Sequence, residues 1–327
     1  MNVLVTGGAG FIGSRFAEML VNREIINPFQ KIVVVDKLTY SGNKANLDGI
    51  RNNPGFVFEE ADICDEVEIG KILKKYAISH IVNFAAESHV DRSIDSSKAF
   101  YETNVMGTRN LLDLARQHGV SRFIQVSTDE VYGSIAQGSW EETQPLDPSS
   151  PYSASKAAAD LMVLAYFKTY GMNIGITRCS NNYGLRQFPE KVIPRFVTNL
   201  LNGQKVPIYG AGAQVREWIH VDDHCRGIYL VMQNGKPGEI YNIAGEVEMP
   251  NIALARLLVN EFGQSEAESF EFVPDRKGHD FRYSLTGNKI KSELGFKSES
   301  DFDVEIPKLV NWYRENRSWW EPLLKKS

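Results

Sequence analysis

The chain has 327 residues, of which 43% are hydrophobic and 24% charged, a composition typical of a globular protein with ample core. Its net charge of -5 offers no basic surface, which argues against a nucleic-acid or anionic-membrane partner. The three cysteines, Cys64, Cys179 and Cys225, are too few and too scattered for a disulfide framework or a zinc site, so we expect no metal. With no leader pattern and no membrane-spanning apolar run, we expect a cytoplasmic protein.

The first predicted element is a buried strand over residues 2–6, followed by glycines and a helical pattern through residue 20. The glycines satisfy both G-x-x-G-x-x-G and, from Gly8, G-x-G-x-x-G. A strand before and a helix after such glycines are typical of a dinucleotide-binding turn, whose backbone approaches a pyrophosphate at the helix N-terminus. We therefore predict cofactor contacts at Gly7, Gly10, Phe11, Ile12 and Gly13.

A second strand over residues 31–35 ends at Asp36, about twenty residues past the glycines. A carboxylate there accepts from the adenosine ribose hydroxyls and repels a 2′-phosphate, so we predict NAD rather than NADP. Lys37 weakens that preference, and the alternative role of Asp36 is a helix or turn cap. Strands at 56–58 and 81–84 end near further candidate cofactor contacts: Asp62, Ile63, Ala85 and Ala86.

Helical patterns over residues 65–76 and 100–118 separate the strands, so strand and helix alternate without interruption. This alternation predicts an α/β fold with a doubly wound, Rossmann-type parallel sheet, which binds ligands beyond the carboxyl ends of its strands. We expect residues 1–180 to form a cofactor-binding domain that carries the catalytic residues. Residues 181–327 should form mainly a smaller substrate-binding lobe, with the chain free to cross between the two.

Two adjacent acids, Asp129 and Glu130, follow the apolar strand at 122–126 and precede Gly133. Neighbouring carboxyl groups at the end of a parallel strand can be driven to different pKa values, one remaining protonated and the other ionised. A solvated acidic loop is the alternative, but the strand before the pair and the glycine after it favour a site. We therefore predict that the chemistry takes place here, with Thr128 beside the pair.

Tyr152 and Lys156 lie four residues apart in a helical pattern and so share one face. A free tyrosine has a pKa near 10, too high for a base at neutral pH. A nearby ammonium group and the positive charge of an oxidised nicotinamide both favour the phenolate and lower that pKa. Such a pair alone is often a solvated helix face, but here it follows a dinucleotide turn and an acid pair.

These motifs together resemble the extended short-chain dehydrogenase/reductases, and among them the nucleoside-diphosphate-hexose 4,6-dehydratases. The resemblance covers nearly the whole chain in collinear order. Besides Tyr152 and Lys156, it is carried by residues 5–14, 36–43, 85–93, 127–133, 179–184, 188–191 and 275–280. It implies a lyase that uses NAD internally, with dTDP-glucose as the first choice of substrate and UDP-N-acetylglucosamine or UDP-glucose as alternatives.

The resemblance also implies the roles of the site residues. Tyr152, hydrogen-bonded to Thr128, takes the C4 hydroxyl proton, and a hydride passes from C4 to NAD and returns to C6. Between these steps Glu130 removes the C5 proton and Asp129 protonates the departing C6 hydroxyl. Further cofactor contacts implied are Lys37, Leu38, Thr39, Phe84, Ser88, Thr103, Tyr152, Lys156 and Asn182.

The implied substrate contacts are Ser88, Thr128, Asp129, Glu130, Asn181, Lys191, Val192, Pro207, Ile208, Tyr209, Arg216, Asn251, Arg276 and His279. Taken singly, most of them would be read as surface charges or core aromatics. Cationic side chains do suit a diphosphate, and a tyrosine can stack on a base. The chain departs from the family at Leu185-Arg186, where Pro-Tyr usually lies beside the sugar, and this leaves the identity of the hexose open.

Two other functions share part of this pattern. A sugar-nucleotide 4-epimerase has the same fold, glycine turn and Tyr-Lys pair but does not need the acid pair, and a non-catalytic NAD sensor needs neither pair. By analogy of fold we also expect a homodimer built on the helices at 100–118 and 152–171. Both carry apolar residues at helical spacing, which could instead face the sheet: Leu111, Leu112, Leu114, Leu161, Met162, Leu164 and Phe167.

Overall fold

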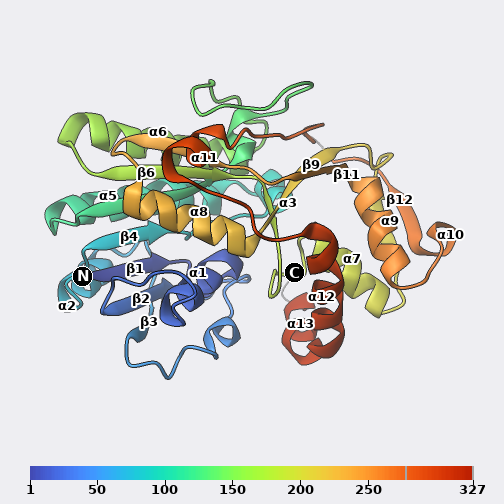
Figure 1. The fold of residues 1–327 in the computed structure, drawn as a ribbon, viewed down its shortest axis with the longest axis horizontal. Coiled ribbons are helices and arrows are strands. Elements are labelled where there is room, and N and C mark those ends of the chain that lie inside the picture. Colours follow the sequence, from blue (N-terminus) through green and yellow to red (C-terminus); the bar gives the residue numbers. More distant parts are fainter. Residues whose placement is uncertain (277, 326–327) are drawn as a thin grey trace.

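The computed structural model describes residues 1–276 and 278–325, so Lys277 in the 275–280 motif lies outside it. A seven-stranded sheet in the order β10-β6-β5-β4-β1-β2-β3 forms the larger part, and all its strand pairs are parallel (Figure 1). The strands are β1 (Asn2–Thr6), β2 (Lys31–Asp36), β3 (Phe56–Glu60), β4 (His80–Asn83), β5 (Arg122–Thr128), β6 (Ile174–Cys179) and β10 (Glu239–Ile243). The predicted doubly wound, Rossmann-type fold is confirmed.

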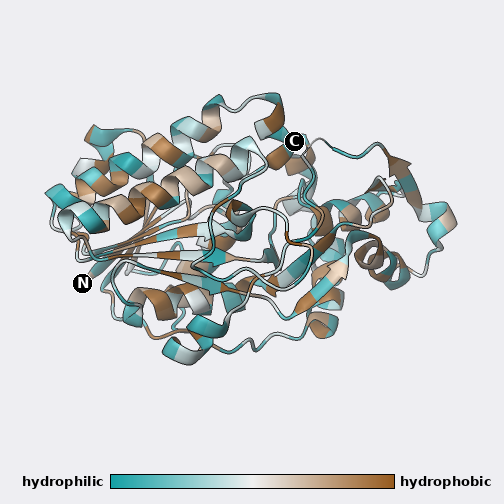
Figure 2. Cartoon of the chain, turned by 90° about the horizontal axis from the view of Figure 1, so that it is seen from above, coloured by the Kyte–Doolittle hydropathy of each residue, from teal (hydrophilic) through white to brown (hydrophobic). Residues whose placement is uncertain are grey.

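Helices cover both faces of this sheet, which Figure 2 shows nearly edge-on between them. One face packs against α1 (Phe11–Val21), α8 (Val221–Asn234) and α11 (Asn288–Leu294), and the other against α2 (Glu66–Lys75), α5 (Thr108–Gln117) and α6 (Pro151–Tyr170). The strand order reverses between β1 and β4, where the chain has wound first one way and then the other. Ligands of such sheets bind at this switch point, beyond the carboxyl ends of the strands.

The smaller lobe contains two short sheets. The first joins β7 (Asn181–Tyr183), β9 (Val215–His220) and β11 (Val247–Pro250), and the second pairs β8 (Val206–Tyr209) with β12 (Phe270–Val273). Their helices are α7 (Val192–Leu201), α9 (Asn251–Glu261), α10 (Glu266–Ser269), α12 (Phe302–Glu315) and α13 (Arg317–Leu324). Between these elements the chain returns to the large sheet to add β10, α8 and α11.

The helix predicted over residues 100–118 is not uniform. The chain forms α3 (Val90–Asp95) and α4 (Lys98–Phe100), then the π-helical turn η2 (Tyr101–Gly107), and only then α5. A side chain at Gly107 would lie about 2.5 Å from that of Ile63, so the helix approaches the loop after β3 closely at that point. Within the described ranges, no helix is long and apolar enough to cross a membrane.

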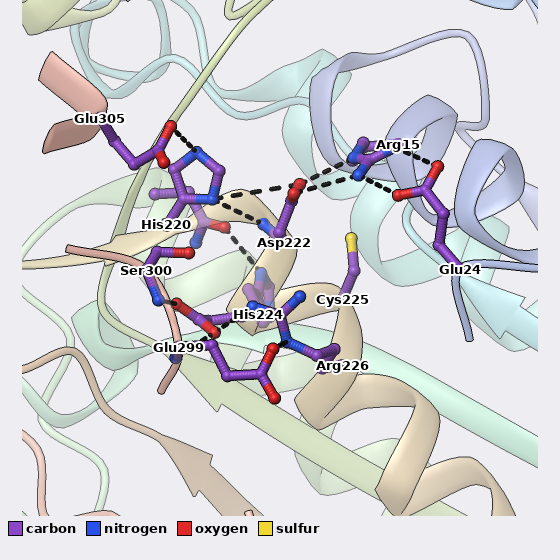
Figure 3. A network of polar contacts seen from close by, with 12 residues as sticks. Arg15, Glu24, His220, Asp222, His224, Cys225, Arg226, Glu299, Ser300 and Glu305 are labelled. Atoms are coloured by element: carbon purple, nitrogen blue, oxygen red, sulfur yellow. Dashed lines mark hydrogen bonds and ion pairs between the residues drawn. The ribbon is translucent and has the colours of Figure 1, made fainter. Parts of the chain in front are cut away.

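A polar network joins the two lobes at the start of α8 (Figure 3). Arg15 of α1 donates from Nε to Asp222 Oδ1 at 2.7 Å and also pairs with Glu24. On the other side, His220 Nε2 lies 3.9 Å from Glu305 Oε2 on α12. The helix that follows the glycine turn is therefore tied through α8 to the smaller lobe.

Candidate active site

A cavity of about 420 Å³ lies at the carboxyl ends of the strands and extends from the glycine turn into the smaller lobe. Of all the residues predicted to contact cofactor or substrate, only Leu38 does not line it. Leu38 has a positive φ of 54°, and its side chain packs against the core instead. Side-chain direction at such an irregular backbone position does not follow from strand periodicity, so the sequence could not have revealed it.

The glycine turn has the shape that a cofactor pyrophosphate requires. Gly7 has a φ of 63°, and a Cβ at Gly13 would lie 2.5 Å from the Gly7 carbonyl oxygen. Asp36 fixes the turn from the end of β2, because its carboxylate accepts from the backbone N–H of Ala9 at 3.0 Å and of Leu38 at 2.8 Å. Open backbone beside a helix N-terminus and an acid at the ribose position together fit a dinucleotide without a 2′-phosphate.

Asp129 begins the short 3₁₀ turn η3 (Asp129–Tyr132) directly after β5 and is 2% exposed. Its Oδ1 accepts from Thr128 Oγ1 at 3.0 Å, while its Oδ2 has no hydrogen-bond partner among the described residues. Burial, together with the nearby carboxyl groups of Glu130 and Glu217, raises the pKa of Asp129 well above its ordinary value. This shift favours the protonated form of Asp129, which is the form that can act as an acid.

Glu130 has a different electrostatic environment. Burial raises its pKa, but the positive charges of Lys191, Arg276 and Arg216 act in the opposite direction. These three cations line the same cavity and come from the smaller lobe. The two neighbouring acids are therefore biased to different protonation states, with Asp129 as the acid and Glu130 as the base.

Tyr152 and Lys156 lie on the first turns of α6, which begins with a capping box at Ser150. Burial and then the neighbouring Glu130 raise the pKa of Tyr152 well above its ordinary value, and a hydrogen bond with Thr128 lowers it. Lys156 Nζ donates to the carbonyl oxygen of Val126 at 2.7 Å, and burial lowers the pKa of Lys156. In this arrangement the protein alone does not favour the phenolate, and the positive charge of an oxidised nicotinamide bound in the cavity would lower the pKa of Tyr152.

Polar atoms of the smaller lobe complete the cavity. Asn181 Oδ1 is buried without a partner in the described part of the chain, and Lys191 Nζ donates to the carbonyl oxygen of Ser88 at 2.7 Å. Arg276 Nη1 lies 3.5 Å from Asp91 Oδ1 across the cavity. In contrast, Leu185 is 41% exposed and Arg186 points to α1, so neither residue of the departing dipeptide lines the cavity. The expectation that this dipeptide lies beside the sugar is therefore wrong.

Several residues of the site were missed from the sequence: Glu190, Trp218 and Tyr283 line the cavity, while Glu217 and His224 lie behind it. His224 is fully buried, and its Nδ1 lies 2.8 Å from Asn182 Oδ1. Since the Asn182 amide nitrogen donates to the carbonyl oxygen of Ser180, Oδ1 must accept, which makes His224 a neutral Nδ1–H donor. No sequence pattern relates His224 to Asn182, so this contact could not have been predicted. Glu190 could have been, because it lies within the 188–191 motif that carries the family resemblance.

Comparison with known proteins extends these observations. Residues 4–309 match the family model described as GDP-mannose 4,6 dehydratase. A dTDP-glucose 4,6-dehydratase from Streptomyces antibioticus is 52% identical over 328 residues, covering 100% of this chain and 96% of that protein. The dTDP-glucose 4,6-dehydratase of Escherichia coli is 42% identical, covering 100% of this chain and 97% of that protein.

Solved structures agree in fold. The crystal structure of DesIV, a dTDP-glucose 4,6-dehydratase from Streptomyces venezuelae with NAD and TYD bound, has a TM-score of 0.96 and 52% identity, covering 99% of this chain and 100% of that chain. A UDP-glucose 4-epimerase from Thermotoga maritima with UDP-glucose has a TM-score of 0.88 and 30% identity, covering 97% of this chain and 100% of that chain. Because a 4-epimerase shares the fold so closely, the reaction must be argued from the site residues.

Proposed function

The chain belongs to the GDP-mannose 4,6-dehydratase family, and we propose that it converts dTDP-glucose to dTDP-4-keto-6-deoxy-glucose for deoxysugar biosynthesis. It is an NAD-dependent hydro-lyase of the extended short-chain dehydrogenase/reductase superfamily. When bound, NAD supplies a reversible acceptor for the hydrogen that leaves C4 of the sugar. In our proposal residues 1–180 hold NAD and carry the catalytic groups, while residues 181–327 mainly hold the sugar nucleotide.

Each polar side chain of the cavity has its own role in the proposed reaction. Tyr152, as the phenolate, takes the proton of the C4 hydroxyl, with Thr128 hydrogen-bonded to it. Once C4 is a ketone, the neighbouring C5–H is acidic, and Glu130 removes that proton. Asp129 gives its proton to the C6 hydroxyl, which leaves as water. Lys191, Arg216 and Arg276 neutralise the diphosphate.

One observation carries this proposal: two neighbouring acids, the buried Asp129 and the half-buried Glu130, lie in the same cavity as Tyr152 in different electrostatic environments. A 4-epimerase oxidises and reduces at C4 and has no proton to remove from C5, so it needs no such pair. An NAD sensor needs neither the pair nor a buried Tyr152. The geometry therefore favours dehydration over both alternatives.

We expect dTDP-glucose to give the largest kcat/KM among dTDP-glucose, UDP-glucose and UDP-N-acetylglucosamine. Recognition of the thymine methyl by the apolar pocket around Ile208 would contribute only about 10–200-fold. The measurement is the rate of 4-keto product formation, with mass spectrometry to show that one water is lost. A larger kcat/KM for either uridine nucleotide would refute the substrate while leaving the reaction type intact, and a product of unchanged mass would indicate an epimerase.

We also propose a homodimer, although not through all the residues that the sequence suggested. Leu111, Leu112 and Leu114 are at most 3% exposed and pack against the sheet, so they cannot form an interface. The large exposed apolar residues of these two elements are Tyr101 and Met106 on η2 and Leu161 and Tyr170 on α6, and η2 and α6 pack against each other.

We expect solution scattering at micromolar concentration to give twice the mass of the chain. The variant Leu161→Asp should become monomeric, because it would bury an unpaired charge in the interface. A monomeric mass for the unaltered protein would contradict the proposal.

A cytoplasmic location is also proposed, because the reaction uses NAD and a sugar nucleotide, and cell fractionation would check it.

A further inference from the structure

Arg186, in the dipeptide that departs from the family, connects the smaller lobe to the cofactor-binding side. Its guanidinium donates from Nη1 to the Asn46 carbonyl oxygen at 3.0 Å and to Glu18 Oε2 at 3.3 Å. Nη2 donates to Glu18 Oε1 at 3.2 Å, so the guanidinium and the carboxylate form a bidentate ion pair. The loop that follows β7 is thereby joined to α1 and to the 3₁₀ turn η1 (Lys44–Leu47).

Asn46 transmits this connection to the glycine turn. It is 3% exposed, and its Nδ2 donates to the carbonyl oxygen of Ala9 at 2.9 Å. The backbone N–H of Asn43 donates to the same oxygen at 3.0 Å. On the other side, Trp319 Nε1 on α13 donates to Asn46 Oδ1 at 3.1 Å. One buried asparagine therefore holds the cofactor turn and is itself held by two elements of the smaller lobe.

The segment between these contacts lines the cofactor end of the cavity. Thr39, Tyr40, Ser41 and Gly42 are all cavity residues, and they lie between Asp36 at the ribose position and the turn that carries Asn46. The ring of Phe188, two residues after Arg186, packs edge-on to Tyr40 at 5.6 Å between centroids. The loop of the smaller lobe thus contacts residues 39–46 at two points.

The backbone of Arg186 is held in an unfavourable conformation. Its φ is 66°, in the left-handed region that residues with a side chain rarely adopt. Such a conformation persists where surrounding contacts hold it, and it is often found at functional positions. Glycine would adopt this φ without cost. The contacts of the guanidinium with Glu18 and Asn46 hold the arginine in this conformation.

We propose that Arg186, acting through Asn46, is a positioning residue that retains NAD in the protein. This inference rests on the proposed use of NAD. In the proposed reaction the cofactor ends each turnover in the oxidation state in which it began, so it need not leave. Residues 39–42 line the cavity beside Asp36, and Arg186 and Phe188 tie the segment 39–46 to the other lobe, so release of the adenosine end of NAD would require this segment to move. Glu18 also pairs with Arg15 at 3.2 Å, and Arg15 joins α1 to Asp222 of α8 through contacts that do not involve Arg186 (Figure 3).

The test is the exchange of bound NAD for isotopically labelled NAD, followed by mass spectrometry of the holoenzyme. In Arg186→Gly we expect exchange to be about tenfold faster, because the charge-assisted hydrogen bonds to Glu18 and Asn46 are lost. The melting temperature of the cofactor-free variant should stay close to that of the unaltered protein, because glycine relieves the backbone. Trp319→Phe keeps an aromatic, though smaller, side chain and removes the N–H, so a smaller acceleration of about two- to fourfold is expected.

Arg51→Ala is the matched control, because Arg51 pairs with Asp48 next to the same turn at 3.1 Å and has a side chain that is 65% exposed. Its exchange rate should be unchanged. Unaltered exchange in both Arg186→Gly and Trp319→Phe would overturn the proposal. So would a melting temperature that falls in the cofactor-free Arg186→Gly protein, since Arg186 would then serve stability alone. If the unaltered chain takes up no NAD, it is the proposed function that fails instead.

Discussion

The double variant Asp129→Asn with Glu130→Gln is expected to lose the elimination of water while keeping NAD bound. Each amide has nearly the shape of the acid it replaces, but Asn cannot donate the acid proton and Gln cannot accept the C5 proton. A positioned acid or base typically contributes 10²–10⁴-fold, so turnover should fall on the order of 10³-fold or more. Tyr152 remains, so one equivalent of a 4-keto hexose that still carries its C6 hydroxyl should accumulate.

The measurements are the mass of the sugar after acid quench and the NAD content of the purified variant. A matched control is Glu141→Gln with Asp147→Asn, which makes the same two chemical changes at exposed positions outside the cavity. Glu130→Gln alone should also stop the exchange of the C5 proton with deuterated water. If the double variant still releases the 6-deoxy product at the rate of the control, the roles given to the two acids are wrong.

Much of the fold could be predicted because its signals are local. The apolar runs at residues 2–6 and 31–35 become β1 and all but the last residue of β2. Asp65 caps α2, which begins one residue after the predicted start of that helix. The acid pair was predictable as well, because charged residues directly after a buried strand have few structural explanations. The fold then brings positions as distant as Gly7 and His279 to one cavity. Many of these residues meet in one cavity because the parallel strands that carry them end at a common edge of the sheet.

Other features depend on tertiary contacts that the sequence does not display. The π-helical turn at Tyr101–Gly107 replaces a regular helix at a point where Gly107 approaches Ile63. Arg216 and Trp218 line the cavity, whereas Glu217, the residue between them in β9, does not. The charge of Glu217 nevertheless raises the pKa of Asp129. No strand was predicted over residues 215–220, so Glu217 could not be placed behind Asp129 from the sequence. Likewise, Arg186 looked like part of the sugar site until its contacts with Glu18 located it elsewhere.

Tyr152→Phe is expected to stop the reaction one step earlier than the acid-pair variant does. Phenylalanine retains the buried ring but has no hydroxyl, so nothing takes the proton from the C4 hydroxyl and the ketone cannot form. Without the C4 ketone, the C5–H is not acidic, and Glu130 has no proton to remove. Loss of this base should lower turnover by about 10²–10⁴-fold. In contrast to the acid-pair variant, the quenched sugar should have the mass of unreacted dTDP-glucose.

Tyr166→Phe on the same helix is the matched control, because it removes a hydroxyl that donates to Asp113 Oδ1 at 2.7 Å outside the cavity. That variant should retain normal turnover. In Tyr152→Phe, deuterium from the solvent should not enter C5, even though both acids are present. Accumulation of a 4-keto hexose in this variant would show that another group takes the C4 proton. The order of the steps would then have to be assigned again, beginning with Lys156, whose pKa burial lowers toward the range of a base.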